Sequence, residues 1–338
     1  MTPAFAPGAP IAPPRAAPPE WSGLLAFDKP VGMTSHDVVA RVRRRLRVKL
    51  AGHLGTLDPG ASGLLLVAVG AATRCVPVWQ GGEKTYLATV RLGVVTSTQD
   101  LQGEVLERHE VRVSETDVRA AALALVGEIA QVPPMVSALR HGGRRLYQLA
   151  RRGEVVERAP RRVRVAAWEW QGFDLPEARF LVRCSGGTYV RTLAHDLGAR
   201  LGVGGALAAL RRLRSEPFGL EGAIALPDLD RGPREAILAR GTPLAGALGV
   251  LPAVVLDAEQ AEMLGHGGRP AVALGEGGVS AALFGRGPRS IVARAENGDP
   301  LALGELAPDP EDPGRARVCP HVVFPWAVRT GRRERGEP

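Results

Sequence analysis

The stretch GHLGTLDPGASGLLLVAVG, from Gly52 to Gly70, contains a single acidic residue, Asp58, shortly before a run of apolar residues. Pro59 restricts the residue before it to extended geometry. Pro59 and Gly60 suit the central positions of a type II turn, in which glycine takes a positive φ. The run Leu64 to Val69 predicts a strand buried on both faces. The pattern therefore predicts a carboxylate on a rigid turn beside the core, although aspartate is also common in ordinary turns.

Length and composition predict a folded protein without a membrane span. The chain has 338 residues, enough for two domains, and 45% of them are hydrophobic. No uncharged apolar run approaches the roughly 18 residues of a membrane helix. Residues 1–20 are rich in alanine and proline and lack the pattern of a signal peptide, so we expect a disordered extension and a cytoplasmic location. Cys75, Cys184 and Cys319 are widely spaced, which favours structural thiols over a zinc site.

The charge indicates a polyanionic partner. The formal net charge is +8, and only three of the 43 basic residues are lysine (Lys29, Lys49 and Lys84). Arginines cluster in two places, at 41–47 on a predicted helix and at 140–152, where Tyr147 is interleaved with them. The second cluster suits a mobile segment that contacts phosphates, and an ordinary exposed helix face is the alternative at both.

Patterning predicts a mixed α/β body followed by a small β-rich region. Strands are expected at Leu24–Phe27 and Thr85–Thr96, and capping boxes at Thr34/Asp37 and Ser114/Asp117 predict two helices. The segments 161–173 and 178–202 predict a strand pair that leads into a helix with leucine every four residues, and 206–218 a further helix and turn. After about Leu251, glycine-punctuated strands predict a second domain, and the charged residues 328–338 a disordered tail.

Several catalytic signatures are absent from the sequence. The region around Ser62 is not G-x-S-x-G, no phosphate-binding loop with its lysine occurs, and GVGG at 202–205 lacks the last glycine of a dinucleotide fingerprint. The histidines lack H-E-x-x-H spacing, which argues against a catalytic metal. His195 beside Asp196 is interpreted as structural. We therefore expect no cofactor. The functional features that remain are Asp58 and a basic surface compatible with RNA.

Five motifs in order resemble the bacterial TruB family of tRNA pseudouridine synthases, from about Trp21 to Phe218. GHLGTLDPGASGLL is similar to the catalytic motif, DKPVGMTSHD to the stretch before it and KTYLATVRLG to the strand after it. QVPPMVSALR…RRLYQLARRG resembles the RNA-binding insertion, and CSGGTYVRTLAHDLG the late arginine motif. The resemblance implies an α+β fold: a mixed, largely antiparallel sheet with flanking helices at 21–245, an insertion at about 131–160, and a PUA-like RNA-binding domain at 250–327.

The resemblance also implies roles for individual residues. Asp58 would be the catalytic nucleophile, Tyr86 the tyrosine packed on the target base and Arg191 the partner of the aspartate. His53, Tyr189 and Leu210 would contact the substrate. Two other observations complete the substrate-binding set: Lys29 is one of only three lysines and lies in the DKPVG turn, and the 140–152 cluster can contact phosphates through Arg140, Arg144, Arg145 and Arg151. One departure is Ser97, where the family commonly has an acidic residue, whereas Asp100 matches the next acidic position.

The implied activity is isomerisation of uridine 55 in the T arm of tRNA, without a protein partner and as a monomer. A carboxylate can attack the sugar carbon C1′ covalently or act on a glycal-type intermediate, and both routes stay open. One alternative is a non-catalytic tRNA-binding or tRNA-folding protein on the same scaffold, although a pure binder needs no buried carboxylate beside RNA. A guide-RNA-dependent pseudouridylase in a larger particle is another, and the long arginine-rich insertion favours stand-alone recognition.

Overall fold

The computed structural model describes residues 21–137, 139–150, 152–275, 290–324 and 326–327. Several predictions lie outside the described residues: the N-terminal extension, the C-terminal tail, the substrate-binding candidate Arg151 and, at 278–285, one of the glycine-punctuated strands expected after Leu251. No helix in the described ranges is both long and apolar enough to cross a membrane.

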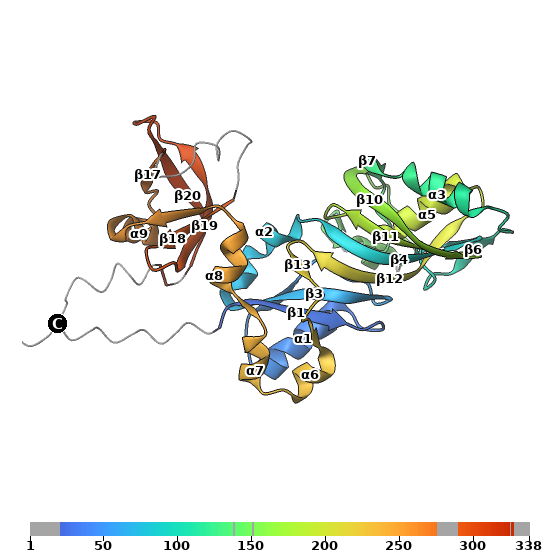
Figure 1. Cartoon of the computed structure of the whole chain (residues 1–338), viewed down its shortest axis with the longest axis horizontal. Helices are drawn as coiled ribbons and strands as arrows, with labels where there is room; N and C mark the ends of the chain where they lie inside the picture. Colours follow the sequence, from blue (N-terminus) through green and yellow to red (C-terminus); the bar gives the residue numbers. More distant parts are fainter. Residues whose placement is uncertain (1–20, 138, 151, 276–289, 325, 328–338) are drawn as a thin grey trace, which may run out of the picture.

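A large mixed sheet forms the body of the protein (Figure 1). Its strand order is β14 (Ile224–Ala225), β1 (Gly23–Lys29), β3 (Ala61–Val69), β12 (Gly205–Ser215), β4 (Lys84–Leu92), β11 (Glu177–Cys184), β10 (Arg161–Asp174) and β7 (Gly127–Gln131). Beside this path, β2 (Ala51–Leu54) pairs with β3, β13 (Phe218–Gly219) with β12 and β15 (Thr242–Pro243) with β1. Among the described strand pairs of this sheet, only β1–β14 and β3–β12 are parallel, which confirms the expected mixed, largely antiparallel sheet.

The strand β12 corrects one prediction. Residues 206–218 were expected to form a helix and turn, because alanine, leucine and arginine favour helices. They instead form the centre of the sheet, where β12 hydrogen-bonds to β3 on one side and β4 on the other. Pairing with two neighbours outweighs an intrinsic helix preference of a few tenths of a kcal/mol per residue, roughly.

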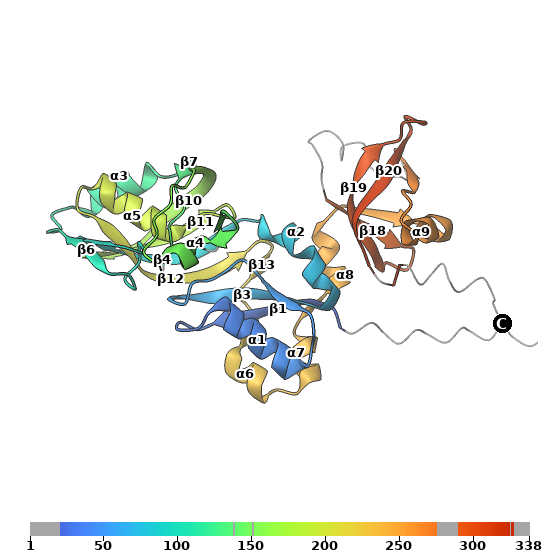
Figure 2. The ribbon, with the colours of Figure 1, turned by 180° about the vertical axis from the view of Figure 1, so that it is seen from behind.

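Helices cover the sheet at its two ends (Figures 1 and 2). At the β1 end lie α1 (Ser35–Leu46), α6 (Leu226–Arg231) and α7 (Arg234–Ala239), and at the other end α3 (Glu115–Leu123) and α5 (Val190–Arg200). Both predicted capping boxes are present, with Thr34 at the start of α1 and Ser114 at the start of α3. The alanine- and leucine-rich run after Ser114 predicts a helix that reaches Gly127, but α3 ends at Leu123 and the chain enters β7 at Gly127.

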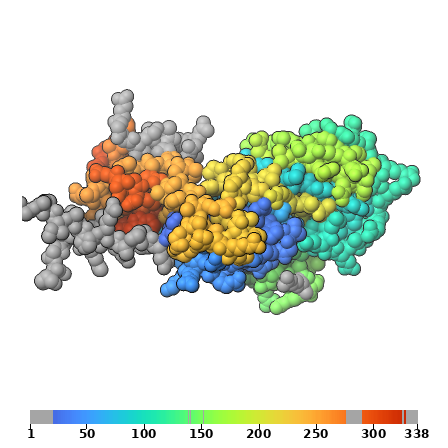
Figure 3. Space-filling view, turned by 60° about the horizontal axis from the view of Figure 1, so that its bottom comes forward, coloured from blue at the N-terminus to red at the C-terminus, as the bar shows by residue number. Residues whose placement is uncertain are grey.

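Shorter elements complete the body. These are the 3-10 helices η1 (Gly70–Cys75) and η2 (Leu248–Val250), the helices α2 (Val76–Gln80), α4 (Leu146–Ala150) and α8 (Leu244–Ala247), and the hairpins β5 (Val94–Thr96)–β6 (Val105–Arg108) and β8 (Arg140–His141)–β9 (Arg144–Arg145). The connection between β7 and β10, residues 132–160, is called the arm below; it contains β8, β9 and α4. In Figure 3 the arm is the light-green lobe that stands out from the body.

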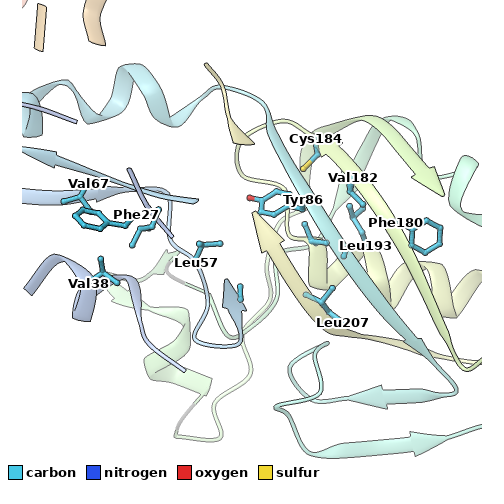
Figure 4. Packing of buried hydrophobic residues seen from close by; sticks show 14 of the residues in the cluster. Phe27, Val38, Leu57, Val67, Tyr86, Phe180, Val182, Cys184, Leu193 and Leu207 are labelled. Atoms are coloured by element: carbon cyan, nitrogen blue, oxygen red, sulfur yellow. The ribbon is translucent and has the colours of Figure 1, made fainter. Parts of the chain in front are cut away.

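The main core runs under both halves of the large sheet (Figure 4). Phe27, Val38 and Val67 belong to the β1–β3 half, and Phe180 and Leu193 to the β4–β11 half. Leu57 and Tyr86 lie between the two groups, and the hydroxyl of Tyr86 points toward the half that contains Leu57 (Figure 4). The seam between the two halves therefore lies beside Asp58.

A second sheet forms the predicted β-rich region. Its order is β16 (Ala253–Leu256), β18 (Ile291–Ala295), β19 (Pro300–Pro308), β20 (Arg315–Val323) and β17 (Ala271–Ala273), with α9 (Ala258–Gly265) beside it. A cluster of buried side chains joins it to the body, since Val292, Leu303 and Phe324 pack with Leu244 and Trp79. The expected domain boundaries at 245 and 250 remain a prediction.

Candidate active site

The loop that carries Asp58 is held by the segment 30–37. The hydroxyl of Ser35 accepts a hydrogen bond from the Leu57 amide at 2.9 Å and lies 3.1 Å from the Leu57 carbonyl. The Gly32 amide donates to the Pro59 carbonyl at 2.8 Å, and the Ala61 amide closes the turn by donating to the Asp58 carbonyl at 3.0 Å. The DKPVGMTSHD motif thus fixes the backbone on either side of the carboxylate.

The predicted turn exists, but the type II assignment is wrong. Gly60 is not among the residues with a positive φ, which a type II turn requires at its third position. The glycine that the local geometry needs is Gly63, with φ of 98°. A Cβ atom there would lie 2.2 Å from the Arg212 carbonyl oxygen on the neighbouring strand. Gly63 therefore permits the close approach of β3 and β12 directly after the turn.

Arg191 joins the Asp58 loop to two other segments. It lies in the first turn of α5 and is 4% exposed. Its Nε lies 3.0 Å from Asp58 Oδ2, and its Nη1 lies 3.7 Å from Asp100 Oδ2. The same guanidinium donates to the carbonyls of Thr98 and Val136 at 3.1 and 2.8 Å. Four acceptors from three segments thus surround one buried cation.

The charge state of Asp58 is set by opposing effects. Burial raises the pKa of the carboxyl above its ordinary value, and the nearby Asp100 acts in the same direction. Arg191, and more weakly Lys29, oppose that rise in pKa. The Asp58 side chain is 42% exposed, because one side of it borders two cavities instead of packing against protein atoms. The arrangement therefore places a carboxylate at the floor of the cavities, open to them on one side and beside a fixed cation on the other.

Asp58 lies where two cavities meet. A cavity of about 760 Å³ runs between the start of α1 and the arm, and its walls include His36, Arg145 and Tyr147. A smaller one of about 300 Å³ reaches toward the sheet. Thr56, Leu57, Asp58 and Ser137 line both. The smaller cavity is large enough to hold one nucleobase, and the larger one can admit a longer segment of a ligand.

The smaller cavity collects several residues expected from the sequence. Tyr86, Tyr189, Arg191 and Leu210 all line it. Tyr86 is buried on β4, and burial raises the pKa of its phenol, an effect that Arg212 opposes. Burial likewise raises the pKa of Tyr189, which directly precedes α5. Both phenols are therefore neutral at physiological pH and present an aromatic face and a hydroxyl.

Lys29 and His53 are placed differently from the expected substrate contacts. Lys29 is fully buried, and its ammonium donates to the carbonyls of Pro30 and Met33 at 2.9 and 2.7 Å. It lines neither cavity, which argues against direct contact with a substrate; burial lowers its pKa to about 8. His53 packs edge-on against His36 at 5.1 Å, and burial lowers its pKa to about 4, so it is neutral at pH 7.

The predicted basic clusters divide into engaged and exposed arginines. Arg144 is exposed on the arm and Arg145 lines the larger cavity, whereas Arg140 is placed only as part of β8. On α1, Arg41 binds Asp230, Arg43 binds the Ala51 carbonyl, and Arg45 binds the carbonyls of Leu229 and Gly232. These three are occupied in packing α1 against its neighbours, so a phosphate role for this helix remains a prediction for Arg44 and Arg47.

Residues to which the sequence assigns no role also belong to the site. Asp100 is linked to Arg191 and is oriented by the Thr98 hydroxyl at 2.6 Å. Arg212 is 1% exposed and donates to the carbonyls of Leu64 and Gly55 at 2.7 and 3.1 Å. Lys84 lines the smaller cavity. The scarcity of lysine was a signal for Lys84, whereas nothing in an arginine-rich sequence marks Arg212. Within the described ranges, no group of three or more His, Cys, Asp or Glu side chains is placed to hold a metal ion.

Comparisons with known protein families point to one class of enzyme. Residues 43–190 match the model of the TruB family pseudouridylate synthase N-terminal domain, and residues 191–261 that of the tRNA pseudouridylate synthase B C-terminal domain. Both describe pseudouridylate synthases. The chain belongs to the TruB family.

Individual relatives agree with this assignment. The tRNA pseudouridine synthase B of Symbiobacterium thermophilum is 50% identical over 257 residues, 75% of this chain and 84% of that protein. The Burkholderia mallei protein of the same name is 46% identical over 256 residues, 76% and 82% of the two chains. Among solved structures, a Cbf5-Nop10-Gar1 complex matches with a TM-score of 0.67 and 27% identity, over 89% of this chain and 84% of that one. An H/ACA RNP bound to a substrate RNA containing 2'-deoxyuridine matches with a TM-score of 0.67 and 26% identity, over 91% of each chain.

Proposed function

We propose that this protein isomerises the uridine at position 55 in the T arm of tRNA to pseudouridine. The observation that carries the proposal is the buried Arg191 bonded to Asp58 at the junction of the two cavities. Relatives named tRNA pseudouridine synthase B support tRNA as the substrate. The smaller cavity would receive one extruded uracil, and the larger one the RNA loop around it.

In the reaction, the N1–C1′ bond of the uridine breaks, the uracil turns, and a C5–C1′ bond forms; C5 then loses its proton and N1 gains one. Asp58 would act at the sugar, either by attacking C1′ or through a glycal-type intermediate. Arg191 favours the anionic form of Asp58, which both routes use. Tyr86 would stack on the uracil, a contact of about 1–3 kcal/mol by analogy with other stacked bases. Its phenol lies on the wall where it can also assist removal of the C5 proton.

The remaining expected residues take supporting roles in this proposal. Tyr189 and Leu210 would pack against the uracil, and neutral His53 would fill the stack that the base has left. Arg144, Arg145 and, outside the described residues, Arg151 would contact phosphates from the arm, together with Arg140. Lys29 would act beneath the loop through its charge rather than by contact. Because of these phosphate contacts, the affinity for tRNA would fall steeply as the salt concentration rises.

The proposal extends to the organisation of the chain. The catalytic domain would comprise residues 21–245, with the RNA-binding insertion at about 131–160, and a PUA-like RNA-binding domain would comprise residues 250–327. The protein would work in the cytoplasm as a monomer without a protein partner. Two further readings are a non-catalytic tRNA-folding protein and a guide-RNA-dependent enzyme. The second is favoured specifically by the structural match to Cbf5 complexes, which contain Nop10 and Gar1.

Tritium release separates these readings. The purified protein is mixed with a T-arm stem-loop that carries tritium at uridine C5, beside Asp58→Ala and the control Asp174→Ala, whose carboxylate is exposed at the end of β10. We expect release by the wild type and the control but none by Asp58→Ala. Binding without release by the wild type would support the tRNA-folding reading. Release only after addition of a guide RNA and protein partners would support the guide-dependent one.

A further inference from the structure

Lys84 lines the smaller cavity from the first residue of β4, two residues before Tyr86. Its side chain is almost completely buried, with 6% of its surface exposed. The ammonium donates to the carbonyls of Gln80, the last residue of α2, and of Gly82 in the loop after it. An ammonium has three N–H donors, so two carbonyls leave one donor for the cavity. Burial of a lysine is unfavourable unless its charge is used or neutralised.

Among the described residues, the groups that face Lys84 do not neutralise its positive charge. From β11 the thiol of Cys184 faces it, and from β12 the guanidinium of Arg212; α2 contributes only the Gln80 carbonyl. Burial is the main reason that the pKa of Lys84 falls to about 8, and Arg212 lowers it further. The pKa of the Cys184 thiol is raised by burial to about 11, so the thiol stays neutral at pH 7. Within the described residues no carboxylate forms an ion pair with Lys84 or with Arg212.

The choice of lysine at this position is also informative. Only three of the 43 basic residues are lysine, and two of these, Lys29 and Lys84, are buried around the site. Lys84 Nζ would lie 3.3 Å from a Cβ placed on Gly186, so the wall of the cavity closes over a compact ammonium. An arginine would bring a wider, planar head into the same space.

This charge suits one moment of the proposed reaction. When the N1–C1′ bond breaks, its electron pair stays on N1, and the detached uracil carries a negative charge spread over the ring and its carbonyl oxygens. That charge disappears when the electron pair of the uracil forms the C5–C1′ bond, and the later loss of the C5 proton is balanced by protonation of N1. Resting on the proposed function, we propose that Lys84 is a further functional residue, whose ammonium stabilises the detached uracil anion from the wall of the smaller cavity. A fixed cation in a poorly solvated cavity favours a developing anion more than the neutral base that precedes it.

A purely structural role is the alternative, because the side chain also caps the end of α2. The two roles differ in their dependence on charge. A neutral amine keeps two N–H donors, which are enough for the Gln80 and Gly82 carbonyls, whereas stabilisation of an anion needs the ammonium. The comparison of a charged with an uncharged side chain across pH therefore separates them.

The test uses Lys84→Met and Lys84→Gln, whose amide retains two donors for capping, with the exposed Lys49→Met as the matched control. Thermal unfolding checks folding, filter binding gives the Kd for the T-arm stem-loop, and single-turnover tritium release is followed from pH 6 to 9.5. We expect each Lys84 variant to bind RNA within about threefold of the wild type and to react on the order of 100-fold more slowly at pH 7. Lys49→Met should match the wild type in all three measurements.

The ratio of the wild-type rate to the variant rate is the decisive quantity. It should fall as pH rises through about 8, because the wild type then loses the ammonium that the variants lack. Titration of Lys29 and Asp58 occurs in both proteins and cancels in the ratio. A ratio near one, or a large ratio that stays constant with pH, would overturn the proposal. If Lys84→Met fails to fold, the same comparison is made with Lys84→Gln. Absence of release by the wild type itself would instead refute the proposed function.

Discussion

Replacement of Arg191 by methionine removes one buried cation and four contacts at once. The contacts are those with Asp58 and Asp100 and with the carbonyls of Thr98 and Val136. Methionine retains an unbranched apolar stem of similar reach, so the change isolates the guanidinium. The matched control is Arg91→Met, which removes an exposed ion pair with Glu177 at 3.2 Å.

The expected loss of stability follows from the acceptors left behind. Removal of one partner from a fully buried ion pair costs about 3–5 kcal/mol. Asp58 and Asp100 are 42% and 16% exposed, so water in the cavities can reach them and the loss should lie near the lower end, about 3 kcal/mol. The control pair should contribute less than about 1 kcal/mol. Urea unfolding of both variants measures the difference.

The expected loss of activity has a sign that the pKa of Asp58 fixes. Arg191 is the largest effect opposing the rise in pKa that burial causes, so its removal raises that pKa further. A carboxylate active as the anion loses activity as pH falls through its pKa, so the acid limb of the rate profile should move to higher pH. Single-turnover tritium release at pH 7 should also fall by about 100-fold or more, the effect expected of one charge-stabilising group.

Two outcomes would refute this reasoning. If Arg191→Met lost no more stability than Arg91→Met, the four contacts would not be the anchor that their geometry suggests. If the rate fell but the acid limb stayed at the same pH, Arg191 would not act by stabilising the Asp58 anion. Measurement above the acid limb of the variant separates a shifted profile from a loss of the chemical step.

Three further substitutions test other parts of the structure. Tyr86→Phe keeps the ring and should bind the T-arm stem-loop about as tightly as the wild type, whereas Tyr86→Ala should weaken binding by about 1–3 kcal/mol in filter assays; equal binding by both would remove Tyr86 from the stack. Arg144→Gln should reduce the slope of log K against log salt by about one, and an unchanged slope would show that the exposed arm arginine contacts no phosphate. Phe324→Ala, at a fully buried side chain in the cluster that joins the second sheet to the body, should cost about 3–5 kcal/mol in urea unfolding, and a loss below about 1 kcal/mol would contradict that packing.

Local signals were sufficient where one segment decides its own structure. The capping boxes at Thr34 and Ser114 predicted the two helix starts because a hydroxyl that binds the third helical amide is a contact within four residues. The buried run after Asp58 likewise identified β3. The type II assignment of the turn at Asp58 was wrong. It requires a positive φ at Gly60, but the residue with a positive φ is Gly63, where β3 approaches β12 closely.

Signals were insufficient where burial depends on distant segments. Among forty arginines, only the motif around Arg191 identified it as a site residue. Arg212 is even more buried, but no sequence motif identifies it. Lys29 was expected to contact substrate because it is a rare lysine in a Pro/Gly turn. Its carbonyl partners at Pro30 and Met33 lie in that same turn, but its complete burial follows from the pairing of β1 with β3.

The proximity of Asp58 and Tyr86 depends on the strand that the sequence predicted as a helix. Strands β3 and β4 do not pair with each other; both pair with β12, so that Arg212 faces Gly63 on one side and Tyr86 on the other. Leu210 and Arg212 are two residues apart and both line the smaller cavity, as the alternation of side chains along a strand requires. A one-residue slip of β12 would turn both toward the opposite face and separate them from Tyr86. The register of β12, and not any local motif, therefore brings the carboxylate and the tyrosine to one cavity.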